Sequence, residues 1–514
     1  MLIKPILIVH RYLGVVLGAV MTLWCLSGFV MMYQGYPNTT STEREAGLEA
    51  LNFKTCCALA DVPLADDAPI MGLKVEMLRG TPVMRLMGKG GPQIFDLQTG
   101  EKVQAIDDSG AREIARAFAF GNGIVGDIKS TAQIKVDQWT VQQWTRLAPI
   151  WKVQFDNPKG SVVYVSGKTA EVVQDTNARE RFLNWFGAIP HWLYPTILRQ
   201  DGKLWNEVVI WASAAGTFLT LTGLIVGFVR LRYGAKRLFP YRRPFWLLHH
   251  IFGTFAGVLV LTWVFSGLLT MSPWGLFETP GTVSLRDFMG GIKWSEARQL
   301  IQKSGDDVSS GDVVNIRAAP LLHAPFVIVT HRDDRQVRIG LEGPEPLTPE
   351  ALRTGLASIK GAGAPKVEVL GHEDDYYYSH HNKMKLPVFR VTFPDKDATR
   401  IYLDRETGEI RQMADATTKR YRWLESGLHD MDFAFLRARP VWDIVVLLLL
   451  SMVTAVCATG TWLAFARVGH DVLSVARALR GGRRDVMNPQ ANTIAPPTSA
   501  AGDSDPAATV RNEA

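Results

Sequence analysis

The chain has 514 residues and a formal net charge of +6, and 47% of its residues are hydrophobic. This length allows several domains, and the composition is typical of a protein that combines membrane spans with soluble parts. Most of the excess positive charge lies in short segments beside apolar runs, so it does not indicate a nucleic-acid partner.

Four apolar runs, at residues 6–33, 208–229, 245–271 and 441–465, are each long enough to cross a lipid bilayer. The first is too long for the core of a signal peptide, and no small-residue cleavage site follows it, so we expect a retained anchor. The segment between the second and third runs and the segment after the fourth are short and rich in Lys and Arg. Such segments mark the cytoplasmic side of a membrane. We therefore expect a bacterial inner-membrane protein with both termini inside and the two long segments in the periplasm.

The predicted organisation alternates membrane spans with outer domains. The spans cover residues 1–34, 196–231, 245–271 and 439–466, and the periplasmic domains cover residues 35–195 and 272–438. A basic cytoplasmic loop covers residues 232–244, and a basic cytoplasmic segment with a disordered tail covers residues 467–514. The cysteines form no framework, because Cys25 and Cys457 lie in spans. The adjacent Cys56 and Cys57 leave a vicinal disulfide or two free thiols open.

Two sequence elements occur twice and indicate an internal duplication. The pattern H-x3-G-x3-G-x5-W-x2-S-G starts at His10 in the first apolar run and at His249 in the third. A tryptophan–histidine–arginine element precedes the second and fourth runs, as Trp185, His191 and Arg199 and again as Trp423, His429 and Arg437. Each half thus contains a span, an outer domain, a histidine and a second span. Parallel repeats of this kind are related by an axis along the membrane normal.

The outer segments repeat as β-hairpins between helical stretches. The sequences VVYVSGKTAEVVQ and RIYLDRETGEIRQ place alternating apolar residues on either side of a glycine-containing turn, and a third hairpin starts at Ile94. Helical patterns cover residues 110–119 and 348–358. The predicted fold is therefore a four-helix membrane bundle with two small α+β domains outside the membrane.

The span pattern, the YLDRETGEI hairpin and the tryptophan–histidine element together resemble the PepSY-associated transmembrane family, up to about residue 475. The family includes iron-uptake proteins and inner-membrane siderophore reductases that bind two haems. The resemblance implies two haem b groups, two α+β domains of the PepSY kind, and reduction of a periplasmic ferric siderophore with release of Fe(II). Some relatives carry a fused flavin or nicotinamide domain, and none follows the fourth run here. We therefore expect a separate electron donor, either a cytoplasmic reductase or a membrane quinol.

Four histidines are the candidate haem ligands. By the predicted topology, His10 and His249 lie near the cytoplasmic ends of their spans, and His191 and His429 lie at the outer ends of theirs. The repeat axis would bring each pair face to face, so that two imidazoles occupy both axial positions of one iron, which suits electron transfer. Taken singly, each histidine has an ordinary interfacial role open to it, such as hydrogen bonding to lipid headgroups. His250 and His470 are alternative ligands.

Small and basic residues accompany these histidines. Four glycines share a helical stripe with a histidine, namely Gly14 and Gly18 beside His10, and Gly253 and Gly257 beside His249. They would either leave a flat surface for a porphyrin or allow close helix packing, and the sequence leaves both interpretations open. Arg199 and Arg437 would either neutralise haem propionates or anchor the chain at the interface.

An aromatic and acidic stretch in the second outer domain is the candidate substrate site. It reads HEDDYYYSHH and offers Asp375, Tyr376, Tyr378, His380 and His381, while its repeat mate offers Trp139 and Trp144. Rings with hydroxyl groups suit a bulky iron chelate above the outer haem, and Asp375, His380 and His381 would also suit a direct iron site. A tyrosine-rich strand packed on its neighbour is an equally good interpretation.

Two other function classes remain open. Domains that resemble these hairpins are associated with inhibition of secreted peptidases, which would make the chain a non-enzymatic regulator. A transporter of siderophore or peptide would need a polar path, whereas the spans hold almost no charge away from their ends. A regulator has no need of four paired membrane histidines, and no serine triad, P-loop or Cys-x-x-Cys motif is present. We therefore expect an oxidoreductase.

Overall fold

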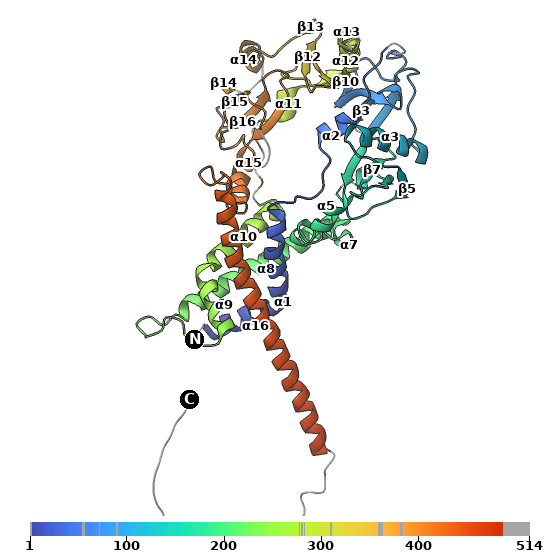
Figure 1. The fold of residues 1–514 in the computed structure, drawn as a ribbon. Helices are drawn as coiled ribbons and strands as arrows, with labels where there is room; N and C mark the ends of the chain where they lie inside the picture. Colours follow the sequence, from blue (N-terminus) through green and yellow to red (C-terminus); the bar gives the residue numbers. More distant parts are fainter. Residues whose placement is uncertain are drawn as a thin grey trace, which may run out of the picture.

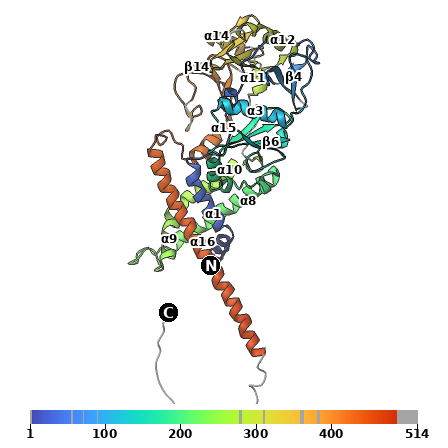
Figure 2. The ribbon, with the colours of Figure 1, turned by 45° about the vertical axis from the view of Figure 1, so that its right-hand side comes forward.

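The computed structural model describes residues 3–53, 57–70, 72–88, 91–142, 144–276, 278, 281, 283–308, 311–357, 363–380 and 384–486. It has two parts, a group of long apolar helices and a set of β-sheets that belong to the two long segments between them (Figure 1). The amino terminus lies at the end of the helices away from the sheets. The last helix runs past the others at that same end in both views (Figures 1 and 2).

Three helices are long and apolar enough to cross a membrane, namely α1 (Ile3–Met31), α8 (Gly202–Val229) and α16 (Val441–Val486). The third predicted span is not one straight helix. It consists of α9 (Pro244–Phe255) and α10 (Gly257–Thr270), which are bent by 62°. The bend falls where Gly257 approaches α8 so closely that a Cβ would lie 2.8 Å from the Leu224 side chain. Glycine is among the residues at which helices kink.

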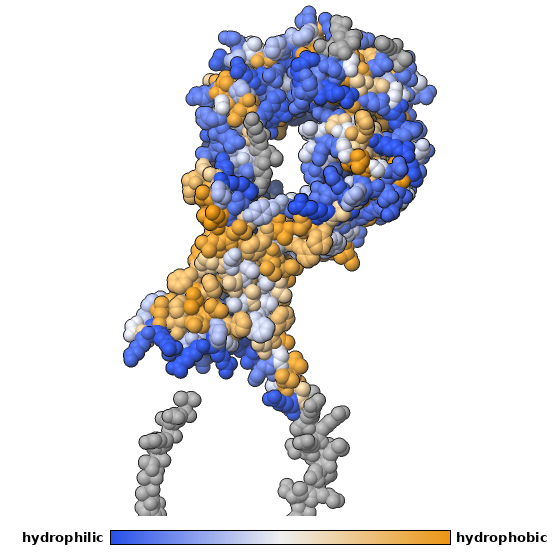
Figure 3. Space-filling model, viewed as in Figure 1, coloured by the Kyte–Doolittle hydropathy of each residue, from blue (hydrophilic) through white to orange (hydrophobic). Residues whose placement is uncertain are grey.

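The long helices pack on one another both within each half of the chain and between the two halves. Helix α1 lies along both α8 and α16, α10 packs on α8, and α9 packs on α16. Their shared core contains the buried side chains of Met21, Leu219, Val260, Val453 and Cys457. Figure 3 shows the apolar surface that these helices present, which suits a lipid bilayer.

Two four-stranded antiparallel sheets share one design. The first has the order β5 (Ile128–Ile134), β6 (Ile150–Phe155), β7 (Val162–Ser166) and β8 (Val172–Thr176), with helix α3 (Asp108–Gly121) packed on it. The second has the order β14 (Lys366–Leu370), β15 (Val388–Thr392), β16 (Arg400–Asp404) and β17 (Ile410–Ala414), with helix α14 (Pro349–Ala357) packed on it. Both sheets have a bulge in their last hairpin. The two hairpins predicted in these segments are present.

A seven-stranded sheet joins the two outer segments, which the sequence did not predict. Its order is β13 (Gly343–Pro344), β12 (Gln336–Gly340), β11 (Val327–His331), β10 (Val313–Ala318), β2 (Gly72–Leu78), β3 (Thr81–Gly88) and β4 (Gly91–Asp96). Antiparallel pairing of β10 with β2 forms the junction and places Ile316 opposite Val75. Strands β1 (Pro69–Ile70) and β9 (Ile292–Lys293) pair as a second link, and helix α12 (Trp294–Lys303) packs on the same core. The ranges 35–195 and 272–438 therefore share one hydrophobic core.

The outer part surrounds an opening. The two four-stranded sheets lie on opposite sides of it, and the seven-stranded sheet lies between them, farthest from the helices (Figure 1). The space-filling view shows the opening framed mainly by hydrophilic residues (Figure 3). The other described elements are short: α2 (Ser41–Ala46), α4 (Trp144–Leu147), α5 (Ala178–Asn184), α6 (Ala188–His191), α7 (Thr196–Arg199), η1 (Pro273–Gly275), α11 (Leu285–Met289), α13 (Gly305–Val308), α15 (Ala416–Tyr421) and the π-helical η2 (Arg422–Gly427).

Candidate functional site

The inner histidine pair forms between α1 and α9. The ring centres of His10 and His249 lie 6.3 Å apart, with 29° between the ring planes. The Nδ1 atom of His10 lies 3.1 Å from the Leu219 carbonyl oxygen, and that of His249 lies 3.1 Å from the Val456 carbonyl oxygen. A carbonyl only accepts hydrogen bonds, so each Nδ1 carries the proton and donates it. Each Nε2 therefore keeps a lone pair for a ligand bond.

Glycines determine how closely these two rings approach the supporting helices. A Cβ at Gly223 would lie 2.6 Å from Cε1 of His10, and a Cβ at Gly460 would lie 2.9 Å from Cε1 of His249. Any larger residue would therefore displace the rings. Gly14 and Gly253 differ, because a Cβ at either position would have no atom within 4 Å. Gly14 and Gly253 thus leave open space one turn from each histidine, as a flat cofactor requires. Gly18 and Gly257 instead allow close helix packing, since a Cβ there would lie 2.9 Å from Thr461 Oγ1 and 2.8 Å from the Leu224 side chain.

The outer pair forms where α6 and the π-helical turn η2 meet the membrane helices. The ring centres of His191 and His429 lie 6.1 Å apart, with 67° between the ring planes. The Nδ1 atom of His191 lies 3.2 Å from the Trp24 carbonyl oxygen and 3.0 Å from Ser27 Oγ. The equivalent distances for His429 are 3.2 Å to Trp263 and 3.1 Å to Ser266. The W-x2-S part of the duplicated pattern therefore supports the outer histidines.

The two pairs fit a metal ion held between imidazoles. When two imidazoles bind opposite faces of one ion at metal–nitrogen distances of about 2 Å, their ring centres lie about 6 Å apart. Ligating histidines also usually donate the other ring N–H to a carbonyl or carboxylate, which fixes the ring orientation. Among the described residues, no three His, Cys, Asp or Glu side chains gather around one point. The pairs therefore suit iron whose other ligands come from its own macrocycle, as in haem.

Hydrogen-bond donors near the outer pair are left without partners. The indole Nε1 atoms of Trp24 and Trp263 are buried and have no hydrogen-bond partner among the described residues. The same holds for Nε of Arg199, whose guanidinium packs on the rings of Tyr194 and Trp205. Buried donors normally have partners. These three donors therefore fit a polar or anionic group of a bound cofactor.

The other candidate ligands and the second arginine are engaged elsewhere. His250 has its Nε2 atom 2.8 Å from the Gly227 carbonyl oxygen and does not face His10. His470 is exposed, with its Nδ1 atom 3.5 Å from an Asp471 oxygen. Arg437, the repeat mate of Arg199, donates from Nε to Asp432 over 2.7 Å. The geometry therefore favours His249 over His250, while Arg199 and Arg437 each keep one buried nitrogen without a hydrogen-bond partner among the described residues.

A cavity of about 340 Å³ lies beside the segment that carries His429. It is lined by Tyr376, Tyr378, Ser379, His380, Gln412, Thr418, Tyr421, Arg422, Glu425, Ser426 and Asp432. Glu425 and Asp432 bracket His429 in the sequence, and the His429 N–H donates to the Glu425 carbonyl over 2.6 Å. Burial, followed by the negative charge of Asp432, raises the pKa of Asp430 to about 6. The cavity thus combines aromatic, basic and acidic groups beside the segment that carries His429.

Of the predicted substrate residues, Tyr376, Tyr378 and His380 line this cavity. Asp375 does not line it, and its carbonyl accepts a hydrogen bond from Arg422 Nε over 2.9 Å. Trp139 is buried in the core of the first four-stranded sheet. His381 and the side chain of Trp144 lie outside the described residues, as does Cys56, while Cys57 is disulfide-bonded.

A buried carboxylate organises the loop that carries the tyrosines. Asp374 accepts hydrogen bonds from the N–H groups of Tyr376 and Tyr377, from Arg390 and from the Tyr402 hydroxyl. Burial by itself would raise the pKa of Asp374, but these bonds hold it below the ordinary value. The first sheet has the same arrangement, in which Asp137 accepts from the Trp139 N–H, Lys152 and the Tyr164 hydroxyl. This contact is therefore a shared structural feature of the two sheets rather than a substrate contact.

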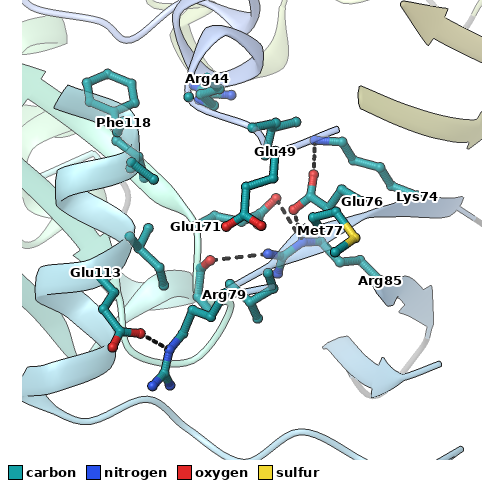
Figure 4. A pocket seen from close by; sticks show the side chains of 17 residues that line it. Arg44, Glu49, Lys74, Glu76, Met77, Arg79, Arg85, Glu113, Phe118 and Glu171 are labelled. Carbon is teal, nitrogen blue, oxygen red and sulfur yellow. Dashed lines mark hydrogen bonds and ion pairs between the residues drawn. The ribbon is translucent and has the colours of Figure 1, made fainter. Parts of the chain in front are cut away.

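A second, smaller cavity of about 110 Å³ lies between the seven-stranded sheet and the first four-stranded sheet (Figure 4). Its buried carboxylate, Glu76, forms ion pairs with Lys74 and Arg85 at 2.5 Å each. Although burial opposes ionisation, Arg85 and Lys74 lower the pKa of Glu76 to about 2. Arg85 also donates to the carbonyl of Ala170. These bonds tie the two sheets together, so we interpret this cavity as structural.

Sequence reasoning identified the histidines but missed their supports. The carbonyl groups of Leu219, Val456, Trp24 and Trp263 belong to the backbone, so residue type does not reveal them. A signal was present nonetheless, because Thr222-Gly223 and Thr459-Gly460 occupy equivalent positions in the two halves. Both threonine hydroxyls lie within 3.5 Å of the nearby histidine Nδ1 atoms.

Comparison with known proteins agrees with the resemblance seen in the sequence. The family model described as PepSY-associated TM region matches residues 7–467. No curated protein matches the chain. Because this match covers most of the chain and both histidine pairs, the protein belongs to the PepSY-associated transmembrane family.

Proposed function

We propose that this protein carries electrons through two haem b groups across a bacterial inner membrane to a periplasmic ferric siderophore, releasing Fe(II). The observation that carries the proposal is the geometry of the two histidine pairs. Their ring centres lie 6.3 and 6.1 Å apart, and each Nδ1 atom lies against a backbone carbonyl. A single pair would be consistent with ordinary packing. Two pairs with equivalent supports favour a cofactor at each.

The chain's own residues would hold and orient both groups. Haem bound between two imidazoles supplies one-electron redox chemistry without an open position on the iron. His10 and His249 would hold the inner group, and His191 and His429 the outer one. The carbonyl contacts keep Nδ1 protonated and the rings fixed, so that Nε2 stays directed to its ligand. The open space at Gly14 and Gly253 would accept the edge of the inner macrocycle.

The two pairs lie at different depths. His10 and Ser27 lie on the same helix, α1, and at a rise of 1.5 Å per residue they are about 25 Å apart along its axis. Because Ser27 contacts His191, the outer pair lies about this far from the inner pair. The inner pair lies on the side of the amino terminus and the basic loop between α8 and α9, which the charge distribution marks as cytoplasmic. Electrons would therefore enter from a separate donor, either a cytoplasmic reductase or a quinol, and leave toward the sheets.

The cavity lined by Tyr376, Tyr378 and His380 is the best candidate for the acceptor site. It adjoins the segment that carries His429, and all its lining residues belong to the second outer segment. Hard oxygen ligands hold Fe(III) in a siderophore, and reduction to Fe(II) weakens that hold. Arg422 and the tyrosine hydroxyls would contact the chelate, and the opening seen in Figure 3 suits the approach of a bulky molecule.

The first test is the absorption spectrum of the purified protein and its haem content per chain. We expect a low-spin b-type spectrum that dithionite reduces, with two haems per chain. Reduced protein should then be reoxidised by a ferric siderophore, with the Fe(II) trapped by a ferrous chelator. A folded but colourless protein from haem-replete cells would contradict the cofactor assignment. Reduced protein that ignores ferric chelates but reacts quickly with another periplasmic oxidant would contradict only the acceptor assignment.

A further inference from the structure

Two cysteine thiols meet inside the helix group, and the proposed electron transfer does not use them. The Sγ atoms of Cys25 on α1 and Cys457 on α16 lie 3.6 Å apart. Both are free thiols. Cys457 is only 7% exposed, whereas Cys25 is partly exposed on the same helix contact. A disulfide bond is about 2.05 Å long, so the two sulfur atoms would have to approach by about 1.5 Å to form one.

The duplication does not account for this pair. The repeat equivalents of Cys25 and Cys457 are Val264 on α10 and Thr220 on α8, which also pack against each other's helices. The histidines, their glycines and the W-x2-S element are kept in both halves. The thiols occur at only one of these two pseudo-symmetric helix contacts, so close packing of the repeat does not require sulfur at these positions.

The thiols lie between the supports of the two histidine pairs. Cys25 follows Trp24, whose carbonyl accepts from His191 of the outer pair. Cys457 follows Val456, whose carbonyl accepts from His249 of the inner pair. A bond between the two sulfur atoms would therefore connect a support of the outer pair to a support of the inner pair. It would also join α1 of the first half to α16 of the second half.

We propose that Cys25 and Cys457 form a peroxide-sensitive site, at which a lipid-soluble hydroperoxide converts the two thiols to a disulfide between the halves of the chain. The sulfur of the more exposed Cys25 attacks the peroxide, the O–O bond breaks, and an alcohol leaves with the thiol proton. The sulfur of Cys457 then attacks the resulting sulfenic acid, an S–S bond forms, and water leaves. Two thiols lose two electrons, and one hydroperoxide becomes one alcohol and one water. No proton needs to leave the apolar interior.

The test uses the full chain with its haems in lipid nanodiscs, in a Cys56→Ser, Cys57→Ser background, treated with cumene hydroperoxide. After denaturation, N-ethylmaleimide counts the free thiols by intact mass. We expect two labels per chain before treatment, none after it, and two again after dithiothreitol, with a cross-linked peptide that contains both cysteines. In the single variants Cys25→Ser and Cys457→Ser no internal disulfide should form. In Cys457→Ser, dimedone should trap a sulfenic acid at Cys25.

A transplanted pair provides the matched control. In a Cys25→Ser, Cys457→Ser background, Val264→Cys and Thr220→Cys place two thiols at the pseudo-symmetric contact. If this pair becomes linked while the native pair keeps two labels, the proposal is wrong. If neither pair reacts, hydroperoxide does not reach this depth and the proposal is equally wrong. Haem content is measured on the same samples, so a colourless protein that still forms the link would contradict the haem assignment alone.

Discussion

Gly223→Ala is the sharpest test of the inner pair, because the glycine determines where the His10 ring lies. A Cβ at this position would lie 2.6 Å from Cε1 of His10. Carbon atoms in ordinary contact lie about 3.5–4.0 Å apart, so the ring must move by about 1 Å or α1 must shift away from α8. Either movement strains the 3.1 Å hydrogen bond from His10 Nδ1 to the Leu219 carbonyl. The ring would then no longer be directed at the position that it shares with His249.

We expect Gly223→Ala to lower the affinity for the inner haem by about 10- to 100-fold, the usual effect of losing a group that orients a metal ligand. The assay is the rate of haem transfer to excess apomyoglobin, followed by absorbance. One of the two haems should leave at least about tenfold faster than in the parent protein. Gly460→Ala should act in the same direction but less strongly, because its Cβ would lie 2.9 Å from the His249 ring.

The control is Gly469→Ala on α16, where a Cβ would have no atom within 4 Å. This variant should release haem at the parent rate. If Gly223→Ala also keeps the parent rate and spectrum, the His10 ring is not confined against α8 in the haem-bound protein. The geometric argument for the inner ligand pair would then fail.

Three further predictions address the other parts of the molecule. Replacing any one of the four paired histidines with alanine, in His10→Ala, His249→Ala, His191→Ala or His429→Ala, should leave about one haem per chain. The variant His250→Ala should keep two haems. If His249→Ala instead keeps both haems, the choice of His249 over His250 as ligand is wrong. In a stopped-flow experiment, His429→Ala should slow reoxidation of the reduced inner haem by a ferric siderophore at least about tenfold, and an unchanged rate would exclude the outer pair from the path. The ion pairs of Glu76 lower its pKa from 4.5 to about 2, so they stabilise the folded outer sheets by about 3 kcal/mol at any pH above 4.5. This contribution is lost as the pH falls from 4.5 toward 2. Thermal unfolding at pH 6 and pH 3 should show a smaller difference for Glu76→Gln than for the parent protein.

The membrane part was predictable because its signals are local. Apolar runs of sufficient length predicted the membrane helices. Some helix ends in the structure differ from the predicted ends. Helix α8 begins at Gly202 because the Asp201 side chain caps it, six residues after the predicted start at 196. Helix α16 continues to Val486, beyond the predicted end at 466, and no proline occurs in it. The bend at Ala256 depends on contact with α8, which the sequence of α9 and α10 does not contain.

The histidine pairs were predictable and the seven-stranded sheet was not, for related reasons. Identical spacing in two halves specifies which side chains become equivalent, so a symmetric arrangement brings His10 to His249 and His191 to His429. Strand pairing between β10 and β2 has no such marker. Alternating apolar residues show which face of a strand is buried but do not identify its partner. For the same reason the choice between His249 and His250 required coordinates, because neighbouring residues on a helix differ in direction by about 100°.

The two halves are equivalent where they support the histidines and different around Arg199 and Arg437. Arg199 packs between two rings with its Nε atom unpaired among the described residues, whereas its mate Arg437 is ion-paired with Asp432. Asp432 also lines the cavity of Tyr376 and Tyr378, and Arg437 stacks over the Tyr378 ring at 3.9 Å. The two repeat-equivalent arginines thus contact different groups: Arg199 contacts aromatic rings, and Arg437 contacts two residues of the cavity wall, Asp432 and Tyr378. If the outer pair holds a haem as proposed, this difference between the arginines would let one half anchor the haem while the other half presents it to an acceptor. The cavity residues of the second half are therefore where acceptor specificity should be altered without loss of haem.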